Sequence, residues 1–181
     1  KTREREKALN SSKLTEAVAR YYAKLLAYKD EYEVARLQAD PGFRKKIEAM
    51  FEGDYRVVHY LAPPLLTRKE EKMRFGPWIR PVFAVLTKLK FLRGSALDPF
   101  GYTEERRTER ALIREYEETV ERLLARLTPQ NHALALQIAA LPDEIRGYGH
   151  IKARSIGPAR NKRDELLARY EAGEGAKRAA A

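Results

Sequence analysis

The stretch from residue 92 to residue 107 holds the residues whose types and spacing are best suited to chemistry. It reads Leu-Arg-Gly-Ser-Ala-Leu-Asp-Pro-Phe-Gly-Tyr-Thr-Glu-Glu-Arg-Arg, so two glycines, a proline and two aromatic residues stand beside arginines and glutamates. Loops carried by a rigid scaffold are where binding and catalytic groups concentrate. Arginine forms bidentate contacts with phosphates and carboxylates. The stretch therefore predicts contact with an anion or with another protein surface.

The residue types that catalyse reactions or bind metals are too scattered to form a site. His59, His132 and His150 lack the short spacing of metal ligands, and we interpret each as a partly buried or surface side chain. Ser95 and Ser155 have no histidine and acid placed to form a nucleophile system. The chain has no cysteine, which excludes cysteine-bound iron–sulfur clusters, cysteine-type zinc sites and a cysteine nucleophile in this segment. We expect no catalytic, cofactor-binding or metal-binding residue here.

The net charge of +10 favours anionic partners, but it is unevenly distributed. Residues 67–97 carry eight Lys or Arg against two Asp or Glu, and residues 150–181 carry eight against four. A solvated charged surface is the plainer interpretation of such runs. Nucleic acid is disfavoured as a partner because no known binding motif accompanies the basic residues. A membrane span is not expected, since no run approaches the roughly 20 apolar residues that a span needs.

The elements that must position these residues are mostly helices. Apolar residues repeat every three or four positions over about 12–37, 40–53, 76–92, 103–127, 128–141 and 150–170. Ser12, Asp40 and Thr103 are expected N-caps, and Pro81 must lie in the first turn of its helix. Thr128-Pro129 should begin the fifth helix, and Gly157-Pro158 should kink or split the last.

The remaining segments are interpreted as short strands, loops or tails. Residues 56–61 are the best strand-like run, and 67–76 are expected to form a charged loop. The sequence thus predicts an all-α bundle of about five to seven helices, with room for one short strand pair near 55–62. We expect a disordered or linker tail over 1–12, a single helical domain over 13–172 and a disordered tail over 173–181.

Four segments carry a resemblance to a known family. They are 27–37 (AYKDEYEVARL), 59–66 (HYLAPPLL) with 75–78 (FGPW), 93–102 (RGSALDPFGY) continuing into 105–110, and 145–152 (IRGYGHIK). In this order they resemble the C-terminal accessory domain of fused indolepyruvate:ferredoxin oxidoreductases, which are large bacterial 2-oxoacid oxidoreductases. The chain departs from that family at Gly157-Pro158, where family members usually continue as helix.

The resemblance implies a parent enzyme that decarboxylates 2-oxoacids oxidatively to acyl-CoA and reduces ferredoxin. It also implies that thiamine diphosphate and iron–sulfur clusters bind in other domains, with none in this segment. No catalytic residue carries over, so whether this segment takes part in catalysis stays open. Because the first residue is Lys, we interpret the chain as part of something larger or as trimmed. The absence of cysteine and of a signal peptide fits the cytoplasm.

Two hypotheses follow for the domain itself. In the first it is an assembly module whose loops contact other domains or subunits of the parent oxidoreductase. In the second its basic surface binds an anion, namely an acidic ferredoxin, the phosphates of CoA or nucleic acid. The simpler alternative pairs the same cations with carboxylates of this chain, namely Asp98, Glu104, Glu105 or Glu109. The candidate interface or anion-binding residues are His59, Arg93, Asp98, Tyr102, Arg106, Arg107, Arg146, His150 and Lys152.

Overall fold

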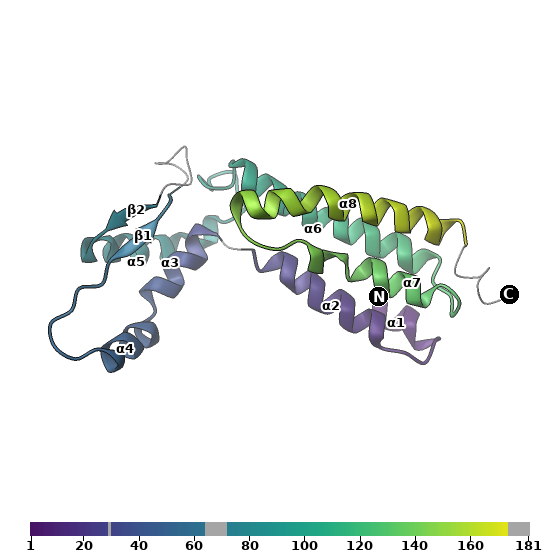
Figure 1. Ribbon diagram of the computed structural model, residues 1–181, viewed down its shortest axis with the longest axis horizontal. Helices are drawn as coiled ribbons and strands as arrows, with labels where there is room; N and C mark the ends of the chain where they lie inside the picture. The colour runs from purple at the N-terminus through teal and green to yellow at the C-terminus, as the bar shows by residue number, and fades with distance from the viewer. Residues whose placement is uncertain (29, 64–71, 174–181) are drawn as a thin grey trace. The chain divides into compact units, whose positions relative to one another are not determined.

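The computed structural model describes residues 1–28, 30–63 and 72–173. Within these ranges the chain forms eight α-helices and one two-stranded antiparallel sheet, which confirms the predicted all-α class with a short strand pair (Figure 1). The chain divides into two compact units where the sequence predicts a single domain. Unit 1 comprises Lys1–Tyr28 and Thr108–Ala181, and unit 2 comprises Lys29–Arg107. None of the helices in the described ranges combines the length and apolar character needed to cross a lipid bilayer.

Unit 1 is a bundle of helices that lie side by side (Figure 1). Its elements are α1 (Thr2–Lys7), α2 (Lys13–Leu26), α6 (Glu104–Ala125, from residue 108 onward), α7 (His132–Ala139), the 3-10 helix η3 (Leu141–Glu144) and α8 (Gly149–Glu171). Two apolar clusters hold these helices together. The first includes Leu14, Leu123, Leu124, Ile138, Leu167 and Tyr170, and the second includes Leu25, Leu112, Tyr116, Ile145, Ile156 and Ala159.

Residues 2–7, which the sequence assigns to a disordered or linker tail, instead form α1. The helix is held by Glu6, whose side chain is completely buried. Its carboxylate accepts hydrogen bonds from the backbone N–H groups of Leu14 and Thr15, both at 2.7 Å, and from the Thr15 hydroxyl at 2.6 Å. It also lies 2.7 Å from Nε2 of His132 on α7. These hydrogen bonds satisfy the buried carboxylate of Glu6 and connect α1 with the start of α2 and with α7.

The start of α7 differs from the prediction. The helix begins at His132 and not at Thr128-Pro129, because the Asn131 side chain closes a turn before it. Asn131 Oδ1 accepts the N–H of Thr128 at 2.8 Å, and its Nδ2 donates to the carbonyl of Arg126 at 2.7 Å. The helix ends at Ala139, just before the predicted break at Leu141-Pro142.

The last helix, α8, is not split at Gly157-Pro158. Gly157 and Pro158 face solvent, whereas Ile156 and Ala159 on either side are buried in the second cluster of unit 1. Pro158 has no N–H to donate to the carbonyl of Arg154, four residues earlier. Arg154 is also exposed, so water can donate to that carbonyl instead. The buried Ile156 and Ala159 hold the helix against the second cluster on both sides of the proline.

Unit 2 combines three helices with the strand pair. Its elements are α3 (Glu31–Ala39), α4 (Pro41–Met50), β1 (His59–Leu61), β2 (Met73–Phe75), the 3-10 helices η1 (Pro77–Ile79) and η2 (Leu89–Leu92), and α5 (Arg80–Lys88) between them. α3 lies against α5, and the core holds Ala35, Phe75, Ile79 and Phe83 with Leu61 and Leu86 beside them.

The predicted helix over 12–37 is wrong, because α2 ends at Leu26 and α3 begins at Glu31. Asp30 caps α3, accepting the N–H of Glu33 at 2.7 Å. In the strand pair, β1 lies where the sequence places it, but β2 falls within the predicted charged loop and pairs with β1 in the register His59 with Phe75. Residues 67–71 of that loop, and residues 174–181 of the tail predicted over 173–181, lie outside the described residues.

Other local predictions are confirmed. Asp40 accepts the N–H groups of Gly42 at 2.6 Å and Phe43 at 3.2 Å, and so caps α4. Pro81 lies in the first turn of α5. Thr103 Oγ1 accepts the N–H of Arg106 at 3.3 Å, which begins α6. Each is a short-range pattern that depends only on neighbouring residues.

Candidate functional site

The connection between η2 and α6, residues 93–103, is organised around one buried carboxylate and is named here the Asp98 loop. Asp98 Oδ2 accepts the N–H of Gly94 at 2.9 Å, and Oδ1 accepts the N–H of Phe100 at 3.1 Å. The Tyr32 hydroxyl on α3 donates to the same Oδ1 at 3.1 Å, and the Tyr32 ring meets the Phe100 ring edge to face. With several donors on a buried acceptor, the loop is held in one conformation.

Two glycines are required for this arrangement. Gly94 has a φ of +75°, in the left-handed region that side chains other than glycine rarely adopt. At Gly101 a Cβ atom would lie 2.9 Å from Oδ2 of Asp98. Gly94, Asp98 and Gly101 are therefore explained by the geometry of the loop itself.

Neither Asp98 nor Tyr32 is tuned for proton transfer. Burial of Asp98 opposes its ionisation, but the N–H of Gly94, the Tyr32 hydroxyl and the N–H of Phe100 outweigh that cost and lower the pKa of Asp98 below its usual value. Burial, together with the hydrogen bond to Asp98, raises the pKa of Tyr32 to about 12. Asp98 thus stays ionised and Tyr32 stays protonated near neutral pH, as suits a structural contact.

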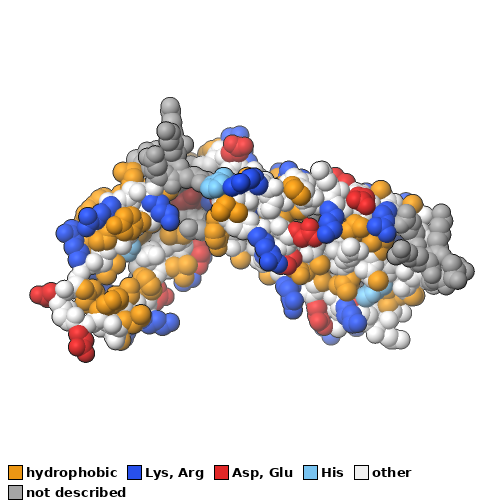
Figure 2. Space-filling model, viewed as in Figure 1, with side chains coloured by type: hydrophobic (Ala, Val, Ile, Leu, Met, Phe, Trp, Pro, Cys, Tyr) orange, Lys and Arg blue, Asp and Glu red, His pale blue; other side chains and the backbone are white. Residues whose placement is uncertain are grey.

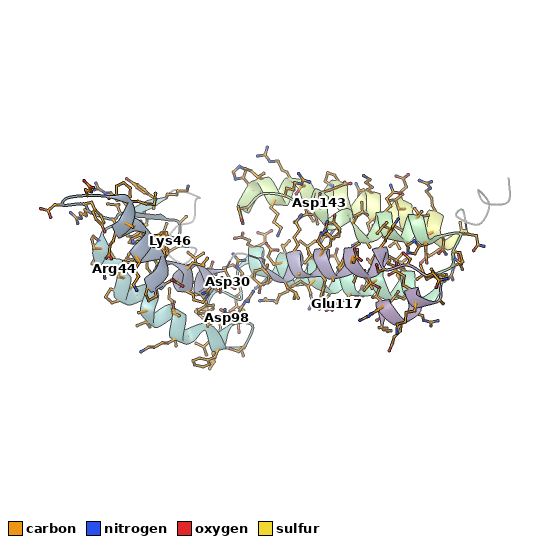
Figure 3. All side chains as sticks on the ribbon, turned by 90° about the horizontal axis from the view of Figure 1, so that it is seen from below. Asp30, Arg44, Lys46, Asp98, Glu117 and Asp143 are labelled. Atoms are coloured by element: carbon orange, nitrogen blue, oxygen red, sulfur yellow. The ribbon has the colours of Figure 1, made fainter. Side chains whose placement is uncertain are left out.

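Two arginines at the ends of the loop pair with carboxylates at the start of α3. Nε of Arg93 lies 2.8 Å from Oδ2 of Asp30. The buried guanidinium of Arg106 lies 3.6 Å from Glu31 and 3.4 Å from Glu105. Burial raises the pKa of Glu31 despite the positive charge of Arg106. Figure 3 labels Asp30 and Asp98 in this region (Figure 3). The charges of Arg93 and Arg106 are therefore used within the chain.

Two further candidates of unit 2 lie elsewhere. His59 on β1 meets the ring of Phe83 edge to face, with the ring centres 5.2 Å apart. Burial lowers the pKa of His59, and the charge of Arg80 adds to this effect. His59 is therefore an uncharged partner of the unit 2 core. Arg107 is exposed in the first turn of α6.

The three remaining candidates belong to unit 1. Arg146 donates to the carbonyl of Asp143 at 2.8 Å and to its carboxylate at 2.5 Å, and this bond lowers the pKa of Asp143. Lys152 Nζ donates to both carboxylate oxygens of Glu109, at 2.7 and 2.6 Å. His150 is exposed near the start of α8. Of the five candidate cations, the four at positions 93, 106, 146 and 152 contact carboxylates of this chain.

The site residues that the sequence analysis missed are Asp30, Glu31 and Tyr32. All three lie inside the single long helix predicted over 12–37, which concealed their role. A signal was present, because Asp30 with Glu33 three residues later is a helix-starting pattern. Reading that pattern as a new helix start would have brought Tyr32 to the beginning of α3.

The outward side of the Asp98 loop is apolar. Leu97 and Tyr102 in the loop and Phe91 just before it are all more than half exposed. The Tyr102 hydroxyl donates to the carbonyl of Ala96 at 2.6 Å, which fixes the ring on the loop. A rigid loop with exposed apolar side chains has the composition of an interface core.

Two features bear on whether the described residues could hold a metal ion or a small ligand. No group of three or more His, Cys, Asp or Glu that could hold a metal ion occurs within 1–28, 30–63 and 72–173. A hollow of about 40 Å³ in unit 1, lined by Leu25, Tyr116 and Ile145 among others, has room for little more than a water molecule.

The sequence matches the profile of DUF6537, described as a family of unknown function, over residues 1–165. No match is found among curated proteins or among solved structures. The match covers both units of the chain except for the end of α8 and the residues after it. The chain belongs to the DUF6537 family.

Proposed function

We propose that this chain is an accessory domain of a cytoplasmic 2-oxoacid oxidoreductase of the indolepyruvate:ferredoxin type, and that it serves assembly or partner docking. In this proposal thiamine diphosphate and iron–sulfur clusters are held by other domains of the parent enzyme. Its partners are those domains or subunits, or the ferredoxin that the enzyme reduces. The family assignment in this proposal rests on the four segments of resemblance described above.

The observation that carries the docking role is the Asp98 loop. Asp98 is bonded to the Tyr32 hydroxyl and to the N–H of Gly94, and Arg93 forms an ion pair with Asp30. Its apolar side chains at Leu97 and Tyr102 face outward. A loop that is already ordered loses little conformational entropy when a partner covers it. This combination supports recognition of a surface more than it supports chemistry.

An anion-binding surface is the alternative proposal, and the contacts of its candidate cations count against it. Lys152 and Arg106 are largely buried with carboxylates, and a ligand would have to displace those contacts. Breaking a buried ion pair leaves a buried charge without its partner, which costs more free energy than a new exposed ion pair supplies. Arg107 is exposed, but a single arginine does not make an anion site.

The test purifies the native protein that contains this chain from its source organism, through a tag at its own locus. We expect the purified material to contain thiamine diphosphate and iron–sulfur clusters, and to reduce ferredoxin when indolepyruvate and CoA are supplied. Material without these cofactors and without this activity would overturn the assignment to an oxidoreductase.

The docking role is tested separately with a matched pair of exposed leucines. Leu97→Asp alters the outward side of the Asp98 loop, and Leu26→Asp alters an exposed leucine at the end of α2. We expect Leu97→Asp to reduce the recovery of the assembled complex by about tenfold, since a charge at an interface core costs 1.4 kcal/mol or more. Leu26→Asp should leave recovery unchanged. Equal recovery from both variants would contradict docking through the loop.

A further inference from the structure

The strand pair of unit 2 turns one of its faces away from the core. In the pairing of β1 with β2, Tyr60 lies opposite Arg74. Side chains alternate along a strand, and Phe75, which follows Arg74, is buried in the core of unit 2. Tyr60 and Arg74 therefore point outward, where Tyr60 is 62% exposed and Arg74 is exposed as well. An aromatic ring and a guanidinium group are neighbours on this outward face.

A second ring and a second guanidinium group lie on the same face, around Gly76. Gly76 follows β2 with an extended backbone, so it shares the side of Arg74, two residues earlier. A Cβ atom at Gly76 would lie 3.0 Å from Nη2 of Arg56 and 3.4 Å from Cδ1 of Trp78. The Arg56 guanidinium and the indole of Trp78 thus cover the place of the missing side chain, and Trp78 is 63% exposed. Arg56, Tyr60, Arg74 and Trp78 are named here the strand-pair face.

The charge around the strand-pair face is mostly of one sign. Residues 52–63 and 72–97 carry seven Lys or Arg against two Asp or Glu, both of which precede Arg56. Two of the seven cations pair with carboxylates at the start of α3, whereas Arg56 and Arg74 form no ion pair with any residue that the structure describes. Figure 2 shows hydrophobic side chains with Lys or Arg beside them over this strand pair (Figure 2). The face therefore favours an anionic partner.

We propose that the strand-pair face binds single-stranded nucleic acid, with bases stacked on Tyr60 and Trp78 and phosphates held by Arg74 and Arg56. Sheet faces with exposed aromatic rings bind the bases of single strands in this way, and neighbouring cations contact the phosphates. Each ring of the face has one guanidinium group beside it, which matches the one base and one phosphate of each nucleotide. The sequence analysis disfavours nucleic acid for want of a known motif, but the pairing of Tyr60 with Arg74 exists only in the folded chain.

The exposed rings favour a nucleic acid strand over other anionic partners. The carboxylates of an acidic protein or the headgroups of an anionic membrane would satisfy Arg56 and Arg74, but neither supplies a flat ring to cover Tyr60 and Trp78. A base covers such a ring with its own face, which strengthens binding by roughly tenfold for each stacked base. Stacking does not depend on base identity, so binding without sequence preference is expected.

The test measures the fluorescence anisotropy of labelled oligouridylate and oligothymidylate strands of about 12 nucleotides, titrated with the full-length protein. We expect both strands to bind, within about threefold of each other, because neither base stacking nor phosphate contact involves the 2′ position. An abasic strand of equal length has the same phosphates without bases, and should bind at least about tenfold more weakly. The logarithm of the affinity should fall against the logarithm of the salt concentration with a slope of about −1.4, as two phosphate contacts require.

Variants assign the two kinds of contact. Tyr60→Ala should weaken binding by about tenfold, and Arg74→Gln should do the same and reduce the salt slope by about 0.7. Trp78→Ala should also weaken binding by about tenfold, whereas Trp78→Phe keeps a ring and should stay within about threefold of the unchanged protein. The part of the tryptophan emission that Trp78→Phe removes should be quenched by the strands, because a stacked base quenches the indole.

Matched controls come from unit 1. Tyr148→Ala replaces a tyrosine that is 69% exposed, and Arg114→Gln replaces an exposed arginine of α6, so neither should change the affinity. Because Tyr60 and Arg74 are exposed, the thermal midpoints of their variants should stay within about 2 °C of the unchanged protein. The comparison of base-containing with abasic strands uses the unchanged protein, so it decides the case even where a variant is destabilised.

Several outcomes would overturn the proposal. These are no binding of either strand, equal binding of the abasic strand, binding of an oligoglutamate of the same charge as tightly as the nucleic acid strands, flotation of the protein with phosphatidylglycerol vesicles, and self-association in sedimentation that Arg74→Gln abolishes. None of these results bears on the cofactor content of the native protein, which tests the proposed enzyme family. The two proposals can therefore fail independently.

Discussion

Lys152 on α8 directs its ammonium group at both carboxylate oxygens of Glu109 on α6, at 2.7 and 2.6 Å. The two side chains are only 18% and 6% exposed, so little water reaches the pair. Lys152, which the sequence analysis names as a candidate for anion binding, is therefore largely buried in unit 1. The ion pair between Lys152 and Glu109 should contribute measurably to the free energy of unfolding.

Lys152→Met should destabilise the protein by about 3–5 kcal/mol, because Glu109 would be left buried without its partner. The double variant Lys152→Met with Glu109→Leu removes both charges and should recover most of that loss. Unfolding in urea, followed by circular dichroism, measures both free energies. Equal losses in the single and double variants would mean that the pair does not act as a unit.

The Asp98 loop should depend on Asp98 far more than on Tyr32. Asp98→Ala removes the acceptor of several hydrogen bonds and should cost about 3 kcal/mol, whereas Tyr32→Phe removes one bond and should cost about 1 kcal/mol. Trp78, the only tryptophan of the chain, lies in unit 2 and reports its unfolding by fluorescence. Similar costs for the two variants would contradict the central role of Asp98.

The stability of unit 1 should fall in acid because of Glu6. Burial opposes the ionisation of Glu6, but hydrogen bonds from Thr15, His132 and the N–H of Leu14 outweigh it and lower the pKa from 4.5 to about 2. A carboxyl with a lowered pKa in the folded state stabilises fully above its unfolded pKa. This contribution is therefore complete above pH 4.5 and is lost progressively as the pH falls toward 2.

Glu6→Gln measures that contribution. At pH 7 the variant should be about 2 kcal/mol less stable, and the difference should narrow at pH 3 because the native carboxyl begins to lose its advantage. Glu4→Gln is the control, since Glu4 is an exposed carboxylate on the same helix. A difference between the native protein and Glu6→Gln that stays constant from pH 7 to pH 3 would refute this account.

Two glycines should respond in opposite directions to alanine. Gly157 lies in the exposed middle of α8, and a Cβ there meets no atom within 4 Å. Gly157→Ala should raise the free energy of unfolding by about 0.5–1 kcal/mol, because alanine loses less chain entropy in a helix. Gly147 has a φ of +90° and would place its Cβ 2.7 Å from Ile151, so Gly147→Ala should destabilise. Thermal unfolding of both variants tests the contrast.

Short-range patterns explain how much of the fold could be predicted from the sequence. The caps at Asp40 and Thr103 involve residues only two or three positions apart, and both are confirmed. Helix α1 could not be predicted, because Glu6 is held by Thr15 and by His132, which is 126 positions away. Strand β2 has only three residues, so the alternation of Met73, Arg74 and Phe75 is too short to predict a strand, and the pairing with β1 specifies it.

The candidate site could be predicted in composition but not in its contacts. The glycines, Asp98 and the arginines of the loop are evident in one stretch of sequence. Their partners Asp30, Glu31 and Tyr32 lie more than 60 positions earlier, on a helix whose start was concealed by a continuous apolar pattern. Only the folded chain shows that Arg93 and Arg106 are paired.

The division of the chain has a consequence for biosynthesis. Unit 2 is continuous in sequence, whereas unit 1 is interrupted by it and needs both Lys1–Tyr28 and Thr108–Ala181. Leu14 and Leu25 leave the ribosome before the partners on α6, α7 and α8 that bury them. Unit 2 can therefore fold while translation continues, but α1 and α2 must wait with their apolar sides uncovered. A protein that ends at residue 107 would keep those sides exposed and be prone to aggregate.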